Sequence, residues 1–158
     1  MAEKKGCMII QLSGDFDKVF AGFTLASAAA AAGMPTTIFF TFWGMKAVQK
    51  GNLTGKGFMG RMVGLMNRGG LQHLNPSKFS FGGVGRWMFK KMMKAKGAAS
   101  LEELRQACID LGVKFYACKT SMDVLEIRRE DLIPEVVDVV GAAKAMKDAD
   151  AASVQYFI

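Results

Sequence analysis

The stretch that decides the fold is VKFYACKTSMD, residues 113–123. Residues 113–117 are a short run rich in apolar and aromatic side chains, and Gly112 ends the helix-like segment 100–111 just before it. This order is typical of a buried strand that is entered from a helix. A thiol, an ammonium group, two hydroxyls and a carboxylate then follow within six residues. Because ligands and chemistry collect at the carboxyl edge of an open α/β sheet, we expect a functional site here.

Cys118 is the residue that we predict to act at this edge. A thiol beside Lys119 has surroundings that lower a thiolate pKa. Thr120 or Ser121 is expected to cap the next helical turn, which would direct backbone N–H groups at the sulfur. The residues alone leave an alternative open, in which Cys118 is a small buried apolar side chain and the two hydroxyls are only caps.

The segments on either side of this stretch alternate between strand and helix patterns. Residues 6–12 are apolar at nearly every position, as in a strand that is covered on both faces. Further strands are expected at 36–42, 136–140 and 152–158, and helices at 16–32, 101–111 and 141–149. This alternation predicts an α/β fold, a single-domain three-layer sandwich with a mostly parallel sheet of about five strands and helices on both faces.

Residues 51–97 interrupt the alternation. They hold most of the glycines and half of the methionines and show little strand character, so we interpret them as a long insertion with short amphipathic helices at about 59–67 and 85–96. No Asp or Glu occurs between Lys18 and Leu101, whereas lysine and arginine are frequent there. Such an asymmetry indicates a basic face that meets something anionic.

Residues 79–96 interleave aromatic and methionine side chains with basic ones. Three interpretations stay open: a helix at a membrane surface, a docking face for a partner, or a helix that covers the domain's own core or an oligomer interface. Nucleic acid is not an expected partner, because no known binding motif accompanies the charge.

Length and composition limit the remaining classes. The chain of 158 residues suits one domain, 1–158, and has no apolar run of the ~18 residues that a bilayer span needs. Its three cysteines include no Cys-x-x-Cys pair, and no His-rich cluster accompanies them. We therefore expect a cytoplasmic protein with reduced thiols, no metal and no cofactor, in which Cys7 and Cys108 pack in the core.

Two other motifs carry little weight. The segment GKGFMG, residues 55–60, matches the dinucleotide pattern G-x-G-x-x-G, but it lacks a preceding strand and an acidic residue about 20 positions on. His73 stands alone, with no cysteine or carboxylate close in sequence, so we expect a loop histidine.

Four short segments together point to a known family: SGDFDK at 13–18, FFTFWG at 39–44, ACKTSMD at 117–123 and VQYFI at 154–158. They resemble the DsrE/DsrF-like sulfur-trafficking proteins, in the branch described as peroxiredoxin-like or sulfurtransferase-like. The resemblance implies a small α/β fold, a homo-oligomer, and a cysteine that carries sulfur as a persulfide, which maps onto Cys118. Some relatives have another reactive cysteine in the middle region, but none lies here between Cys7 and Cys108, which argues against a two-cysteine relay.

These observations predict an intracellular sulfur carrier or sulfurtransferase that passes sulfur from Cys118 to the thiol of an acceptor protein. Lys119, Thr120 and Ser121 would support the thiolate. Trp43 would wall a pocket near Cys118, because its strand ends at the same edge, although a core role fits equally well. The alternative is a non-catalytic binding module that attaches to a redox complex or a membrane surface through the basic insertion. A thiol peroxidase ranks last, since no peroxide-site motif or resolving cysteine is present.

Overall fold

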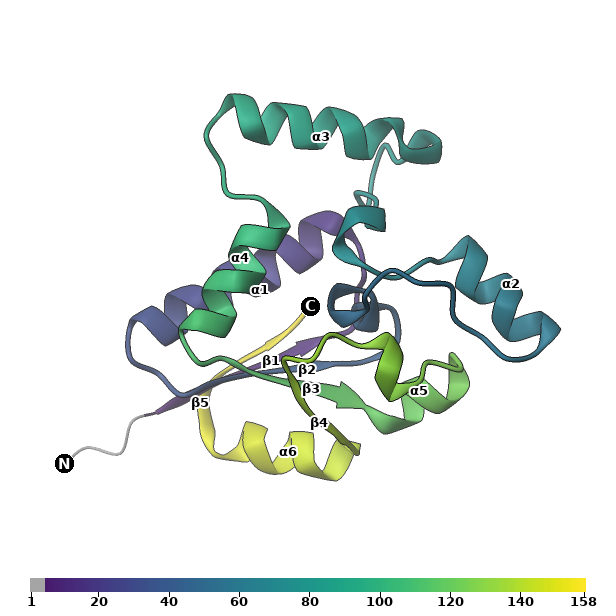
Figure 1. The fold of residues 1–158 in the computed structure, drawn as a ribbon. Coiled ribbons are helices and arrows are strands. Elements are labelled where there is room, and N and C mark those ends of the chain that lie inside the picture. The colour runs from purple at the N-terminus through teal and green to yellow at the C-terminus, as the bar shows by residue number, and fades with distance from the viewer. Residues whose placement is uncertain (1–4) are drawn as a thin grey trace.

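The computed structural model describes residues 5–158. Its centre is a five-stranded sheet in the order β4-β3-β2-β1-β5, with every neighbouring pair parallel (Figure 1). The strands are β1 (Gly6–Gln11), β2 (Thr36–Phe40), β3 (Lys114–Cys118), β4 (Val136–Val140) and β5 (Ala152–Phe157). The predicted α/β class and the parallel sheet are confirmed.

Helices cover both faces of this sheet (Figure 1). Helices α1 (Phe16–Ala31) and α4 (Leu101–Asp110) lie together over one face, and α6 (Ala142–Asp150) lies over the other. The short helix α5 (Lys119–Val124) follows β3 directly at the carboxyl edge. Helix α4 begins with a capping box, in which the Ser100 hydroxyl accepts from the Glu103 N–H and the Glu103 carboxylate accepts from the Ser100 N–H.

The larger core lies between the sheet and the helices α1 and α4. Phe23 of α1, Phe40 of β2 and Phe115 of β3 meet there, and the rings of Phe40 and Phe115 pack edge to face with centroids 5.4 Å apart. A smaller apolar cluster under α6 contains Met8, Phe39 and Cys118. Successive side chains of a strand point to opposite faces, so β3 sends Phe115 to the larger core and Cys118 to the smaller one.

Cys7 and Cys108 pack in the core, as predicted, with exposed fractions of 2% and 0%. Burial raises the pKa of the Cys7 thiol and raises the pKa of Cys108 to about 12. The Cys108 thiol donates to the carbonyl of Phe23. Neither group is an effective nucleophile at neutral pH, because the thiolate is the reactive form.

The insertion folds into short helical pieces between β2 and α4. They are the helices α2 (Phe58–Met66) and α3 (Val84–Ala95) and the 3₁₀ helices η2 (Leu71–His73) and η3 (Phe81–Gly83), and a further 3₁₀ helix, η1 (Phe42–Val48), precedes the insertion. Both expected amphipathic helices are present within one residue of their predicted bounds. The strand expected at 36–42 ends at Phe40, and the chain enters a 3₁₀ helix at Phe42. A further 3₁₀ turn, η4 (Arg129–Asp131), precedes β4.

No helix within residues 5–158 combines the length and the apolar character that crossing a bilayer requires.

Candidate functional site

Cys118 is both the last residue of β3 and the N-cap of α5. Its exposed fraction is 7%. The sequence analysis expected Thr120 or Ser121 to cap this helix, and that expectation is wrong. The chain turns from strand into helix with no loop between them, so Cys118 itself takes the extended backbone of the N-cap, with φ −76° and ψ 118°.

Hydrogen bonds from two segments converge on the Cys118 sulfur. Burial of the sulfur by itself raises its pKa, but the Ser121 hydroxyl and N–H, the Thr41 hydroxyl and the Thr120 N–H all act in the opposite direction. The hydrogen bonds prevail, and the pKa of Cys118 lies below the ordinary value for a cysteine. Cys118 therefore has a larger thiolate fraction at neutral pH than either of the other two cysteines.

Ser121 joins this helix to the end of β2. Its side chain is fully buried, and its Oγ lies 2.9 Å from Thr41 Oγ1 and accepts a hydrogen bond of 2.9 Å from the Phe42 N–H. Phe42 has a φ of 42°, in the left-handed region that residues with side chains seldom adopt. This backbone conformation accompanies the turn that presents the Phe42 N–H to Ser121.

The same turn depends on Gly44. Its N–H donates to the carbonyl of Leu12 at 2.7 Å, which brings the segment after β2 against the end of β1. A Cβ atom at Gly44 would lie 2.0 Å from the backbone oxygen of Gln11, so only glycine fits this approach. The glycine of the FFTFWG segment thus fixes the backbone that holds Thr41 and Phe42 beside Ser121.

Thr41 is the functional candidate that the sequence analysis missed. It is the first polar residue after the apolar strand β2, in the same position relative to its strand that drew attention to Cys118. The rule that polar residues at the carboxyl edge of a parallel sheet lie close together could therefore have identified it.

Lys119 and Trp43 are placed away from the sulfur's hydrogen bonds. Lys119 Nζ pairs with the Asp123 carboxylate, and both side chains are more than 60% exposed. Thr120 contributes through its N–H, while its side chain is exposed. Trp43 is 46% exposed. The structure thus brings Cys118, Ser121 and the Thr120 backbone together, and the roles of Lys119 and Trp43 stay predictions.

Trp43 lines a cavity of 640 Å³ at the carboxyl edge. The other walls include Ser13 and Asp15, from the SGDFDK segment, and Lys46 of η1. Burial lowers the pKa of Lys46, although the Asp15 charge acts in the opposite direction, and Lys46 Nζ donates to Asn67 Oδ1 at 2.7 Å. Three conspicuous sequence features, SGDFDK, FFTFWG and the basic insertion, therefore meet at this one depression.

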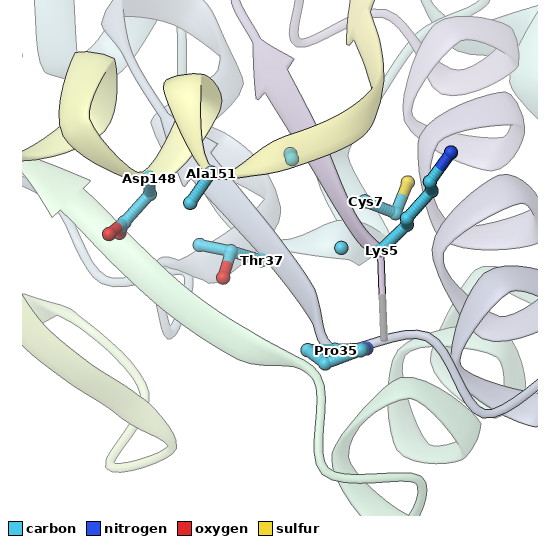
Figure 2. Close-up of a pocket in the computed structure, with 8 residues that line it drawn as sticks. Lys5, Cys7, Pro35, Thr37, Asp148 and Ala151 are labelled. Carbon is cyan, nitrogen blue, oxygen red and sulfur yellow. The ribbon is translucent and has the colours of Figure 1, made fainter. Parts of the chain in front are cut away.

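A second cavity, of 320 Å³, lies at the opposite edge of the sheet (Figure 2). Cys7, Pro35 and Thr37 line it from the starts of β1 and β2, and Asp148 and Ala151 line it from the end of α6. The raised pKa of Cys7 makes its thiol a poor nucleophile for this cavity. In the part of the chain that the structure describes, no group of three or more His, Cys, Asp and Glu side chains is arranged to hold a metal ion.

Comparison with known proteins agrees with the fold and with the segments quoted above. The DsrE/DsrF/DrsH-like family model matches residues 3–157. The chain is 37% identical to the uncharacterized protein YrkE of Bacillus subtilis, over 99% of this chain and 98% of that one. It is 31% identical to the sulfur carrier protein DsrE2 of Allochromatium vinosum, over 99% of both chains.

A solved structure shows the same fold. The ychN protein of E. coli superposes with a TM-score of 0.56 at 11% identity, over 98% of this chain and 99% of that one. The profile match over nearly the whole chain and the two full-length relatives lead to one conclusion. The chain belongs to the DsrE/DsrF/DrsH-like family.

Proposed function

We propose that the protein is an intracellular sulfur carrier in which Cys118 holds sulfur as a persulfide or thiosulfonate and passes it to the thiol of an acceptor protein. The observation that carries the proposal is the set of hydrogen bonds from Ser121, Thr41 and the Thr120 N–H, which lower the pKa of Cys118. The relative named as a sulfur carrier, which aligns over the full length, supports it.

The transfer would proceed as two displacements at sulfur. The Cys118 thiolate attacks the outer sulfur of a donor persulfide, a new S–S bond forms, and the donor leaves as its thiolate. With tetrathionate the attack leaves a thiosulfonate on Cys118 and releases thiosulfate. The acceptor thiolate then attacks the outer sulfur of the Cys118 persulfide, and Cys118 leaves as a thiolate, so no net oxidation occurs and no cofactor is required.

The hydrogen-bond donors around Cys118 suit both steps. They stabilise negative charge on the sulfur when it is the nucleophile and again when it is the leaving group. The basic insertion would attract an anionic donor or an acidic acceptor. We include in the proposal a homo-oligomer and a cytoplasmic location, with sulfur donor and acceptor proteins as partners.

Intact-mass analysis tests this proposal. The wild type, Cys118→Ser and the control Cys7→Ser are incubated with thiosulfate, tetrathionate or polysulfide. We expect the wild type and Cys7→Ser to gain one sulfur atom or one thiosulfonate group, and Cys118→Ser to gain neither, because only Cys118 has a lowered pKa. A persistent adduct on Cys118→Ser, or no adduct on the wild type with any donor, would contradict the proposal.

A second candidate function is a binding module that acts through the insertion without Cys118. The observation that favours it is the exposure of large apolar side chains on both helices of the insertion, among them Phe58, Leu65 and Met66 of α2 and Trp87 of α3. Binding of a partner that is unchanged in Cys118→Ser would support this function.

A further inference from the structure

Helix α3 is attached to the rest of the molecule along one face. Phe89 packs against Phe16 of α1 with ring centroids 6.5 Å apart, and Met93 lies against the larger core. Beyond these contacts the helix stands clear of the domain, at the top of Figure 1. A cavity of 1000 Å³, lined by Met93, Leu101 and Leu104, separates it from α4. The helix is therefore a projecting ridge.

The opposite face of α3 is apolar and exposed. Val84, Trp87 and Met92 are 62%, 64% and 56% exposed, and Met88 lies with them at helical spacing. Phe79 and Phe81, just before the helix, are also exposed, by 64% and 72%, and their ring centroids are 6.1 Å apart. We call these six residues the α3 apolar face. A contiguous exposed surface of this kind marks an interaction site.

The charged residues of α3 itself are all positive. Arg86, Lys90, Lys91, Lys94 and Lys96 lie on the helix or at its end, and no Asp or Glu occurs between Lys18 and Leu101. Lys91 lies four residues after Trp87, on the same side of the helix, and its Nζ sits 5.1 Å from the centre of the Trp87 ring, so its stem covers apolar surface while its charge reaches outward. Bulky aromatic and methionine side chains with lysines at the margin are the composition of a helix that lies in a membrane interface.

We propose that the α3 apolar face binds the surface of a membrane that contains anionic lipids. The helix would lie in the plane of the headgroups, with its apolar side chains below them and its lysines among the lipid phosphates. Its 12 residues are too few to span the bilayer, so the contact is peripheral.

Charge and shape favour this occupant over a second copy of the chain. A symmetric dimer through the α3 apolar face would bring the same basic residues of both copies together, which is unfavourable. A convex ridge of mixed aromatic and flexible side chains also needs no pocket of matching shape when its partner is a fluid interface. The proposal does not depend on sulfur transfer by Cys118.

Vesicle binding tests the proposal. The full chain is mixed with phosphatidylcholine vesicles and with vesicles that also contain phosphatidylglycerol, and bound protein is measured by flotation. We expect binding only to the anionic vesicles. Lys91→Gln/Lys96→Gln should lower the partition coefficient about 25-fold, at about fivefold for each lysine. The control Lys114→Gln/Lys147→Gln, with the same net charge, alters exposed lysines away from α3 and should bind like the wild type.

Apolar insertion is measured separately. The chain has two tryptophans, so in a Trp43→Phe background the fluorescence reports Trp87 alone. We expect a blue shift on addition of anionic vesicles. Trp87→Ser/Met92→Ser should abolish vesicle binding, whereas Val137→Ser/Met146→Ser, which changes exposed side chains of β4 and α6, should not.

Three results would overturn the proposal. The first is equal binding of the wild type and Trp87→Ser/Met92→Ser to anionic vesicles. The second is a blue shift of Trp87 that depends on protein concentration without lipid and accompanies dimers in sedimentation, which would assign the face to a second copy. The third is binding to polyglutamate as tight as to anionic vesicles, which would assign it to an acidic protein.

Discussion

At the scale of single residues, two hydroxyls and two backbone N–H groups lower the pKa of Cys118, and Ser121 supplies one of each. The sequence suggested a neighbouring charge, Lys119, for this role, but that ammonium pairs with Asp123. A neutral hydrogen-bond donor has one consequence that a surface lysine lacks. Its effect on the thiolate is little screened by salt, because the donors are neutral and Ser121, which supplies two of them, is fully buried.

Replacing Ser121 by alanine should raise the pKa of Cys118. The variant removes the hydroxyl donor to the sulfur, so the pH profile of alkylation by iodoacetamide should move to higher pH. It also deprives the Phe42 N–H of its acceptor, and we expect the free energy of unfolding to fall by about 1–3 kcal/mol. Alkylation rates across pH and urea unfolding measure the two effects.

Thr120→Ala is the matched control, because Thr120 acts on the sulfur through its N–H and its side chain is exposed. Its alkylation profile should coincide with that of the wild type. A profile for Ser121→Ala that also coincides with the wild type would show that the hydroxyl does not govern the thiolate.

How much of this site was predictable depends on the separation of the residues along the chain. Cys118 and Ser121 are neighbours, so their positions after a strand were enough to select both. Thr41 meets Ser121 across 80 positions, and Phe42 meets it across 79. Contacts at that separation depend on strand order, which the periodicity of one sequence does not specify.

At the scale of elements, the bounds of strands and helices followed from local patterns. Gly112 follows the end of α4, as expected, and the Ser100–Glu103 capping box begins this helix with residues that are neighbours in the sequence. The error in the cap of α5 has a physical cause. Hydroxyl residues are the usual caps, but here a cysteine occupies the turn and Ser121 lies one turn inside the helix, with its side chain committed to β2.

Glu126 links the start of α2 to the segment after Cys118 through hydrogen bonds. Glu126 lies two residues after the end of α5, and its carboxylate accepts from the Lys56 N–H and, at 3.0 Å, from the Gly57 N–H at the start of α2. Gly60 is needed beside it, because a Cβ there would lie 2.1 Å from Glu126 Oε2. The start of α2 is thus tied to the segment that follows Cys118.

The hydrogen bonds between the Glu126 carboxylate and the start of α2 should depend on pH. Hydrogen bonds from the Lys56 and Gly57 N–H groups lower the pKa of Glu126 below its ordinary value of 4.5. A carboxylate whose pKa is lowered by folding stabilises the folded state at pH values above its unfolded-state pKa. This stabilisation is lost as the pH falls through the folded-state pKa. We expect the amide proton shifts of Lys56 and Gly57 to titrate with a midpoint below 4.5, as followed by NMR.

Glu126→Gln should remove this titration from both amides. Glu130→Gln, at an exposed carboxylate that pairs with Arg128, should leave it unchanged. If both amides still titrate in Glu126→Gln, another group holds the start of α2.

At the scale of the whole molecule, the α/β class and the parallel sheet were predictable because strand and helix patterns alternate strictly outside the insertion. Which face of α3 packs against the domain was not predictable. Its sequence is amphipathic, but which face meets the domain depends on Phe16 and the larger core, far away along the chain. The long apolar face that remains exposed is visible only once the fold is known.

The aromatic cluster of the larger core links α1 to the two central strands. Phe115 is fully buried and contacts Phe23 and Phe40. Phe115→Ala should lower the free energy of unfolding by about 3–5 kcal/mol, because it removes buried apolar area and leaves a cavity. Urea unfolding measures this change.

Val137→Ala is the comparison variant, since Val137 is 60% exposed on β4. Its effect should stay within about 0.5 kcal/mol. A loss of under about 1 kcal/mol in Phe115→Ala would mean that the core relaxes into the vacated space.

The strand order has a consequence for synthesis. β1 lies between β2 and β5, and β5 follows the other four strands of the sheet in the sequence. While a ribosome is still producing α6, β1 has its hydrogen-bonding edge open on the side where β5 will pair, and an open edge is a template for other chains. The sheet is completed only after β5 has left the exit tunnel. Nascent chains that are stalled before β5 should therefore depend on chaperones more than the finished protein does.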